Sequence, residues 1–109
     1  MFYKAAPGGE RQPLPGITQK TLVHGEKTLF TEFRLEKGAT LPSHAHPHEQ
    51  TGYLVKGRIR LTIGPETFDA NPGDGWCIPG NTEHGAEILE DSLAIEVFSP
   101  VRTDYLPDK

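Results

Sequence analysis

Residues 38–57, GATLPSHAHPHEQTGYLVKG, contain three of the chain's five histidines: His44, His46 and His48. Side chains alternate between the two faces of an extended strand, so His44 and His46, two residues apart, point to the same side. Two imidazoles on one face can begin a site for a divalent metal ion. Such a site needs further ligands, and the chain offers Gln50 close by and His84 far along the sequence. We expect the remaining residues to form a scaffold that brings these side chains together.

The bulk composition is typical of a small protein with one domain. A chain of 109 residues is long enough for one hydrophobic core but not for two. A formal net charge of -4 argues against a nucleic-acid-binding face, which needs basic residues. The sequence shows no apolar run that would span a membrane and no signal-like leader, which predicts a cytoplasmic protein. The single cysteine, Cys77, lies in the apolar stretch WCIP and is predicted to be a small buried side chain.

The chain is rich in turn-forming residues, with 12 glycines and 10 prolines spread along its length. We expect nine or ten short strands, among them residues 20–24, 27–35, 41–46, 51–56, 58–63, 67–70, 76–78, 86–89 and 92–99. Within residues 58–63, Ile59, Leu61 and Ile63 alternate with polar residues, as on a strand with one buried face. No segment has the pattern of a helix of three turns. Many short strands with regular turns predict an all-β sandwich or barrel, in which inward positions of several strands converge.

The two ends of the chain differ from this pattern. Residues 1–16 are rich in proline and glycine, and we interpret them as an arm with a short strand at residues 2–4, lying on the domain or on a partner subunit. The barrel itself is predicted to occupy residues 17–100. Residues 101–109 are predicted to form a polar tail.

Two motifs identify the family that the chain resembles, the cupins. Their first motif is a glycine, His-x-His, a glutamate and a second glycine, found here as Gly38, His44, His46, Gln50 and Gly57. Gln50 replaces the usual glutamate. The second motif corresponds to Gly73, Pro79, Asn81 and His84. Asn81 replaces a glycine, and asparagine tolerates the left-handed backbone better than most residues. The resemblance covers about residues 35–99 and implies a double-stranded β-helix, the cupin jelly-roll barrel.

Residues 46–57 and 96–106 resemble one narrower group, the single-domain pectin-degradation cupins that open 4,5-unsaturated uronates. The group's metal ligands, three histidines and a glutamine, correspond to His44, His46, Gln50 and His84. Its catalytic acid, aromatic residue and arginine correspond to Glu96, Phe98 and Arg102. The acid in that group is an aspartate, so Glu96 is one methylene longer. The same pattern is also similar to metal-dependent polyketide cyclases, and small cupins usually form homodimers.

The proposed ligand set has a chemical consequence. Three imidazoles and a neutral amide leave a divalent metal its full positive charge, which suits Lewis-acid chemistry. The two-histidine, one-carboxylate site of iron oxygenases carries an anionic ligand instead. We therefore expect one divalent transition metal (nickel, zinc, manganese or iron) and chemistry without redox change. Glu49 would restore a carboxylate ligand if the register differed by one residue, but neighbouring strand residues face opposite sides.

Several residues near this site have two interpretations. Glu96 and Phe98 share a strand face, and Glu96 is either an acid inside the barrel or a solvent-facing residue of an edge strand. Inside, burial would raise the pKa of Glu96 and a metal ion would lower it. Arg102 either contacts a substrate carboxylate in bidentate fashion or is an ordinary surface arginine. His48 is left outside the ligand set, at the barrel mouth. Tyr53 and Trp76 are interpreted as core or pocket wall.

These observations favour a metal-dependent isomerase or lyase that acts on a small anionic sugar acid, such as a 4,5-unsaturated uronate. One alternative is an oxygen-dependent cupin such as a dioxygenase, which would consume oxygen with its substrate. A cupin similar to the polyketide cyclases is a second alternative. Another is a non-catalytic barrel that binds a small molecule. The expected partners are a small-molecule substrate and a second copy of the chain, with no nucleic acid and no membrane.

Overall fold

Two long strands form the centre of the structure, a computed structural model that describes residues 1–106. They are β5 (Glu49–Ile63) and β8 (His84–Ser99), which pair antiparallel along almost their whole length. Their register shifts between Leu54 and Ile59, where both strands bend. Gly57 lies at this bend with φ +96°, and a Cβ there would lie 2.1 Å from the Ser92 Oγ. The bend divides each long strand into two halves that belong to different layers.

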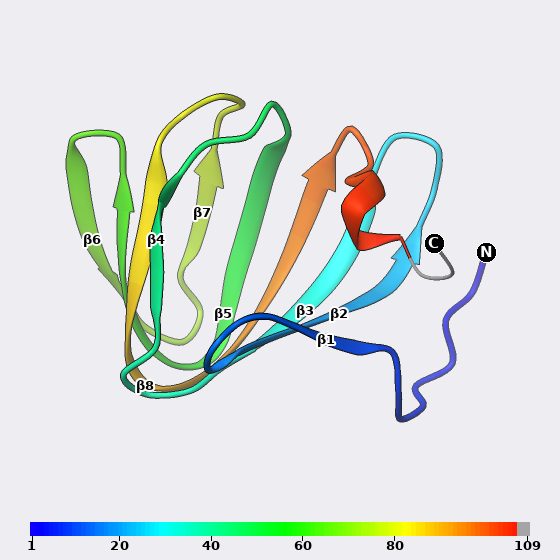
Figure 1. Cartoon of the computed structure of the whole chain (residues 1–109), viewed down its shortest axis with the longest axis horizontal. Coiled ribbons are helices and arrows are strands. Elements are labelled where there is room, and N and C mark those ends of the chain that lie inside the picture. The colour runs from blue at the N-terminus through cyan, green and yellow to red at the C-terminus, as the bar shows by residue number, and fades with distance from the viewer. Residues whose placement is uncertain (107–109) are drawn as a thin grey trace.

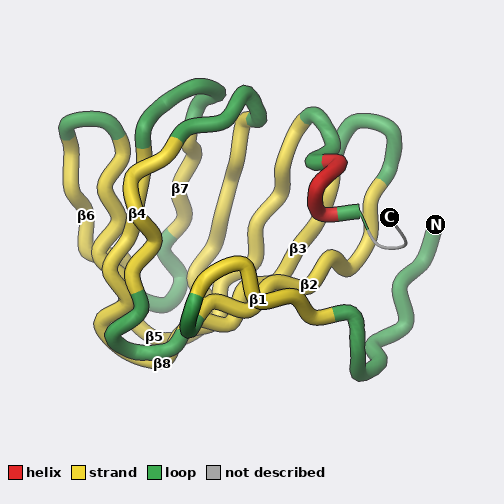
Figure 2. Tube along the Cα trace, viewed as in Figure 1, coloured by secondary structure: helices red, strands yellow, loops and turns green. Residues whose placement is uncertain are grey.

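The shorter strands add to these halves. They are β1 (Glu10–Leu14), β2 (Ile17–His24), β3 (Leu29–Leu35), β4 (Thr40–His44), β6 (Glu66–Ala70) and β7 (Gly75–Ile78). The sheet order is β1-β2-β3-β8-β5-β6, with β4 also paired to β8 and β7 to β5. One half of β8 pairs with β3 and the other with β4. Figure 1 shows the strands curving around a common interior, and Figure 2 shows one short helical turn, η1 (Thr103–Tyr105), beside them. The all-β prediction is confirmed.

The core fills the space between the two layers. One cluster lies at the bend and consists of Leu54, Ile59, Ala70, Ile88 and Ala94. The second cluster lies nearer the β1–β3 side and consists of Ile17, Leu29, Phe33 and Phe98, with Val101, Tyr105 and Leu106 packed against it. Along each strand every second side chain points inward, and most of these core residues occupy such positions. The period-two patterns of the sequence therefore place them correctly.

The structure corrects several boundaries. Residues 51–56 and 58–63 form one strand rather than two, as do residues 86–89 and 92–99, because each pair continues through the bend. The short strand of the N-terminal arm is Glu10–Leu14 and not residues 2–4. The ligand strand ends at His44, so His46 lies in the loop that follows. The division of the chain at residues 16 and 100 stays a prediction.

Three solvent-exposure predictions are wrong. Cys77 is exposed, because Trp76 and Ile78 on either side of it point inward. Tyr53 is 46% exposed on the outer face of β5, not part of the core. The segment after Ser99 is not simply a polar tail, since Tyr105 and Leu106 pack on the core. The last part of that predicted tail, residues 107–109, lies outside the described residues.

Within residues 1–106, no helix is long and apolar enough to cross a membrane. The cytoplasmic location stays a prediction.

Candidate metal centre and acid

Three of the predicted ligands meet at one end of the barrel. His44, the last residue of β4, pairs across the sheet with His84, the first residue of β8. His46 reaches the same point from the loop after β4. The ring centroids of His44 and His84 are 4.2 Å apart, and those of His46 and His84 are 4.9 Å apart. One nitrogen from each imidazole lies within 4.8 Å of the other two. Such spacing allows all three histidines to bind a single ion.

The backbone orients each imidazole. The Nδ1 atom of His44 lies 3.0 Å from the Pro42 carbonyl oxygen, and that of His84 lies 2.8 Å from the Thr82 carbonyl oxygen. The Nδ1 of His46 lies 3.0 Å from the carbonyl oxygen of His48. With Nδ1–H donating to these carbonyls, each Nε2 carries the free lone pair that a metal requires. Hydrogen bonds of this kind fix the tautomer and ring orientation of metal-binding histidines.

The loops that carry the ligands are joined by backbone contacts. Asn81 N–H donates to the His46 carbonyl oxygen over 2.7 Å. Asn81 has φ +62°, the left-handed conformation expected from its place in the second motif. This contact holds the loop before His84 against the loop that carries His46, so two distant parts of the chain keep a fixed spacing.

The protonation of His46 and His84 suits metal binding. Burial lowers the pKa of His46 to about 4, and the nearby Arg102 charge and the other two imidazoles act in the same direction. Burial also lowers the pKa of His84. Both rings are therefore neutral at neutral pH, and only a neutral imidazole can donate a lone pair to a metal.

The fourth predicted ligand, Gln50, faces inward and is only 6% exposed, whereas Glu49 beside it is exposed. The register that would place Glu49 at the site is therefore excluded. Gln50 Oε1 lies 3.1 Å from the His46 Nε2. On its other side, Gln50 Nε2 donates to Glu96 Oε2. The amide of Gln50 thus contacts both the histidine cluster and the acid.

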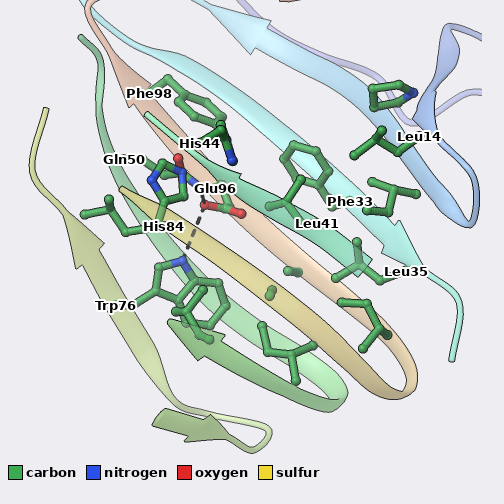
Figure 3. A pocket seen from close by; sticks show the side chains of 18 of the residues that line it. Leu14, Phe33, Leu35, Leu41, His44, Gln50, Trp76, His84, Glu96 and Phe98 are labelled. Carbon is green, nitrogen blue, oxygen red and sulfur yellow. Dashed lines mark hydrogen bonds between the residues drawn. The ribbon is translucent and has the colours of Figure 1, made fainter. Parts of the chain in front are cut away.

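Glu96 points into the barrel, not to solvent, and lines the cavity inside it (Figure 3). Its Oε2 accepts hydrogen bonds from Gln50 Nε2 and, at 3.4 Å, from Trp76 Nε1. Burial raises the pKa of Glu96 to about 7, although both of these hydrogen bonds and the Arg102 charge act to lower it. A carboxyl group with such a pKa can both give and take a proton near neutral pH.

Phe98 and Arg102 form the wall next to the acid. Phe98 is 1% exposed, and its ring centroid lies 5.8 Å from that of His46. The Arg102 guanidinium carbon lies 5.0 Å from the Phe98 ring centroid and 4.1 Å from that of Tyr105. Its Nε and Nη2 donate to Asp104 at 3.2 Å and 2.7 Å. One edge of Arg102 is therefore occupied, and Nη1 has no hydrogen-bond partner among residues 1–106.

Sequence reasoning missed the residues that hold this wall in place. Arg11 of β1 donates through Nη1 to the Asp104 carbonyl oxygen and through Nη2, at 2.6 Å, to that of Leu106. The Thr21 hydroxyl donates to the Tyr105 carbonyl oxygen. Together they fasten η1 over the cavity, so that Tyr105 joins its lining. No motif marks these contacts, which join residues 84 or more positions apart in the chain.

His48 contributes to the site through its backbone. Its carbonyl oxygen orients His46, as described above, while its ring is partly buried and its Nδ1 has no hydrogen-bond partner among the described residues. Burial lowers the pKa of His48. The ring centroids of His46 and His48 are 5.5 Å apart.

The cavity between these groups has a volume of about 100 Å³. Pockets for drug-sized ligands are several times larger. The polar groups of its lining lie toward the histidine end, and the rest of the wall is apolar, formed by Leu14, Ile17, Phe33, Leu35, Leu41, Ile59, Leu61, Ile78, Ala86, Ile88 and Ala94. A site of this size and polarity fits a small molecule that binds at the histidine end.

Comparison with known proteins agrees with the fold and the motifs. The cupin domain family (Cupin_2) matches residues 31–99. The chain belongs to the cupin family. This cupin is 31% identical over 93 residues to the pectin degradation protein KdgF of Dickeya dadantii (strain 3937), and the match covers 84% of each chain. The solved structure of KdgF from Halomonas sp. superimposes on this cupin with a TM-score of 0.90 at 34% identity, covering 97% of this chain and all of the other.

A more distant relative of this cupin is the oxalate decarboxylase OxdC of Bacillus subtilis (strain 168). The two are 30% identical over 80 residues, which is 69% of this chain but only 21% of the larger protein. The motifs predicted a resemblance to pectin-degradation cupins. The two KdgF proteins, whose matches cover 84% and 97% of this chain, confirm that resemblance.

Proposed function

We propose that this cupin is a metal-dependent isomerase or lyase that opens a 4,5-unsaturated uronate, or a closely related small sugar acid, by proton transfer. The observation that carries the proposal is the position of Glu96. Its carboxyl group lies inside the barrel and is hydrogen-bonded to Gln50, whose amide oxygen faces the histidine cluster. An acid and a metal-binding cluster are thus joined in one cavity, next to an arginine. The similarity to KdgF proteins supports the same activity.

The donor set fits a divalent ion. His44, His46 and His84 would hold it through their Nε2 atoms, which the backbone carbonyls leave free, and Gln50 would add its amide oxygen. When bound, a nickel, zinc, manganese or iron ion supplies Lewis acidity toward substrate oxygens. Because all four donors are neutral, no protein charge would cancel the charge of the ion.

Glu96 would perform the proton transfer. As a carboxylate it takes the proton of the hydroxyl on the ring carbon that becomes the aldehyde. The bond from that carbon to the ring oxygen breaks, and its electron pair forms an enolate with the neighbouring double bond. The carboxylic acid then returns the proton to the far carbon of that double bond, which gives a linear keto acid. The reaction is an isomerisation, and Glu96 ends as it began.

The remaining groups would bind and orient the substrate. The Nη1 of Arg102 would donate to the substrate carboxylate, while Asp104 and the two aromatic rings hold the guanidinium in place. Phe98 would exclude water from the face of the acid. A negatively charged substrate would be favoured because the site lining includes this cation.

The function is tested by the loss of ultraviolet absorbance when the conjugated double bond of an unsaturated uronate disappears. Glu96→Gln keeps the shape of the side chain and should slow turnover by about 100-fold or more. Glu49→Gln is the matched control, because Glu49 is exposed on the same strand as Gln50, and it should remain as fast as wild type. Wild-type protein that turns over no unsaturated uronate refutes the substrate, and a fast Glu96→Gln variant refutes the mechanism. Oxygen uptake with substrate would instead favour the dioxygenase alternative.

The metal site is tested by elemental analysis of protein purified without chelator. We expect close to one equivalent of a transition metal in wild type and far less in a His44→Ala/His46→Ala double variant. His24→Ala is the control, since His24 ends β2 and belongs to no cluster of possible ligands among the described residues. Equal metal content in the wild type and the double variant would contradict the assignment.

We also propose that the protein is a homodimer that pairs through the outer face of β3, β8 and β5. Neighbouring outward positions on this face are apolar: Phe30 pairs with Val97, and Ile95 pairs with Tyr53. The 46% exposure of Tyr53 leaves part of this surface open to a partner. Light scattering should give about twice the 12.0 kDa of one chain. Val97→Lys should halve this mass, whereas Phe68→Lys, at an exposed site on β6, should not; a wild-type mass of one chain would contradict the dimer.

A further inference from the structure

The acid of the site is held by two donors on one oxygen. Gln50 Nε2 and Trp76 Nε1 both donate to Glu96 Oε2. The other oxygen, Oε1, accepts no hydrogen bond from any residue in the described part of the chain and is not sealed off from the cavity. Figure 3 shows it directed away from both donors. The two oxygens of the carboxyl group are therefore not equivalent.

Trp76 reaches this acid across an intervening strand. Gly52 of β5 pairs with Trp76 of β7 on one side and with Glu96 of β8 on the other. The three residues form one row on the inner face of the sheet, with the glycine in the middle. A Cβ on Gly52 would lie 2.2 Å from Trp76 Nε1 and 2.3 Å from its Cε2. The indole therefore lies over Gly52, and any larger residue there would push it away from Glu96.

On the basis of the proposed function, we propose that Trp76 is a positioning residue. Together with Gln50 it fixes Oε2 of Glu96, so that Oε1 is the oxygen that takes the substrate hydroxyl proton and returns it to carbon. Gly52 belongs to the same arrangement because it provides the space through which the indole passes. The indole–carboxyl distance of 3.4 Å is long for an N–H···O bond. Such hydrogen bonds are often long without substrate and tighten in the substrate complex.

The contact can be measured without turnover because Trp76 is the only tryptophan of the chain. The indole N–H gives a single signal in a proton–nitrogen correlation spectrum, recorded on the full chain as purified and after loading with diamagnetic zinc. We expect this signal to move upfield in Glu96→Ala, which removes the acceptor, and in Gly52→Ala, which displaces the indole. Gly25→Ala is the matched control, because Gly25 has no positive φ and a Cβ there would meet nothing within 4 Å. An indole signal that is the same in wild type, Glu96→Ala and Gly52→Ala would overturn the proposal.

Kinetics distinguish positioning from substrate binding. Trp76→Phe keeps an aromatic ring but removes the donor, and should lower kcat about 10-fold or more while KM stays within about twofold. Phe68→Leu, at an exposed site on β6, should change neither constant. A Trp76→Phe variant with wild-type kcat, or one in which only KM rises, would refute the positioning role. If wild type turns over no unsaturated uronate, the proposed function fails, but the indole signal still decides whether Trp76 holds Glu96.

Discussion

Replacing Gly57 by alanine should destabilise the barrel at its bend. Gly57 has φ +96°, and a residue with a Cβ loses about 1–2 kcal/mol in the left-handed region. The added Cβ would also lie 2.1 Å from Ser92 Oγ and 2.5 Å from the Asp91 carbonyl oxygen. Ser92 cannot easily move, because it is 4% exposed and its hydroxyl is bonded to the backbone at Arg58 and Glu90. Overpacking of this kind costs about 1–3 kcal/mol, so Gly57→Ala should lose about 2–5 kcal/mol in total.

Gly73 provides a control that separates the two contributions. It has the same φ of +96°, but a Cβ there would meet nothing within 4 Å. Gly73→Ala should therefore lose only the conformational part, about 1–2 kcal/mol. Urea unfolding followed by far-ultraviolet circular dichroism measures both losses of unfolding free energy. The slope of that free energy against urea concentration should be unchanged if the denatured state is unaffected. Equal losses for Gly57→Ala and Gly73→Ala would refute the reasoning, because the close contacts at the bend would then cost nothing.

Three further predictions concern the site and its support. Removing the metal with a chelator should lower the thermal unfolding temperature, since a metal at 100 times its Kd stabilises the folded state by about 2.7 kcal/mol. The unfolding temperature of a His84→Ala variant should not respond to the chelator. A wild type that also fails to respond would contradict the metal site. In metal-free protein, burial holds the pKa of His46 near 4, below its usual 6.5, so the unfolded chain takes up this proton first. The free energy of unfolding should therefore fall as the pH drops from about 6.5 to 4 in urea titrations, and His46→Gln should weaken that trend; an unchanged trend would refute it. Arg11→Ala removes the contacts to the Asp104 and Leu106 carbonyl oxygens, which are worth roughly 1 kcal/mol, and should raise KM several-fold. Arg34→Ala, at an exposed site, should leave KM unchanged. Equal KM values for Arg11→Ala and wild type would count against the role of η1.

The meeting of the three histidines could be predicted from the sequence because local geometry and two short motifs determine much of it. The short spacing of His44 and His46, with His84 in a second motif, is sufficient to indicate one site once the strands form a closed interior. The left-handed conformation of Asn81 follows from its place in the second motif and is confirmed at φ +62°. Alternation requires that only one of Gln50 and Glu49 faces inward, and the first motif assigns that place to Gln50. For Gln50 and Asn81 the signal lies within a few residues of the side chain, whereas the approach of His84 to His44 and His46 depends on the fold.

Other features depend on contacts between distant residues, which a single sequence does not reveal. The indole of Trp76 reaches Glu96 only because the register of three strands places Gly52 between them. The contact from Arg11 to the backbone of η1 likewise joins the two ends of the chain. The exposure of Cys77 is different, since strand alternation already places it opposite its neighbours. The apolar composition of WCIP indicates burial, but alternation decides which face Cys77 occupies, so the prediction from composition is wrong.

The identity of residue 50 links the two halves of the proposed chemistry. Its side chain faces His46 with an oxygen and Glu96 with a nitrogen, so one amide can serve as a metal ligand and as a hydrogen-bond donor to the acid. A glutamate there would bring a second carboxylate within hydrogen-bonding distance of Glu96, and two such groups cannot both stay ionised. One of them would hold a proton that the reaction needs to move. The neutral amide of Gln50 avoids this conflict, and for the same reason leaves the charge of a bound ion undiminished. In the proposed chemistry, the amide at position 50 therefore lets Glu96 exchange its proton without a competing carboxylate beside it.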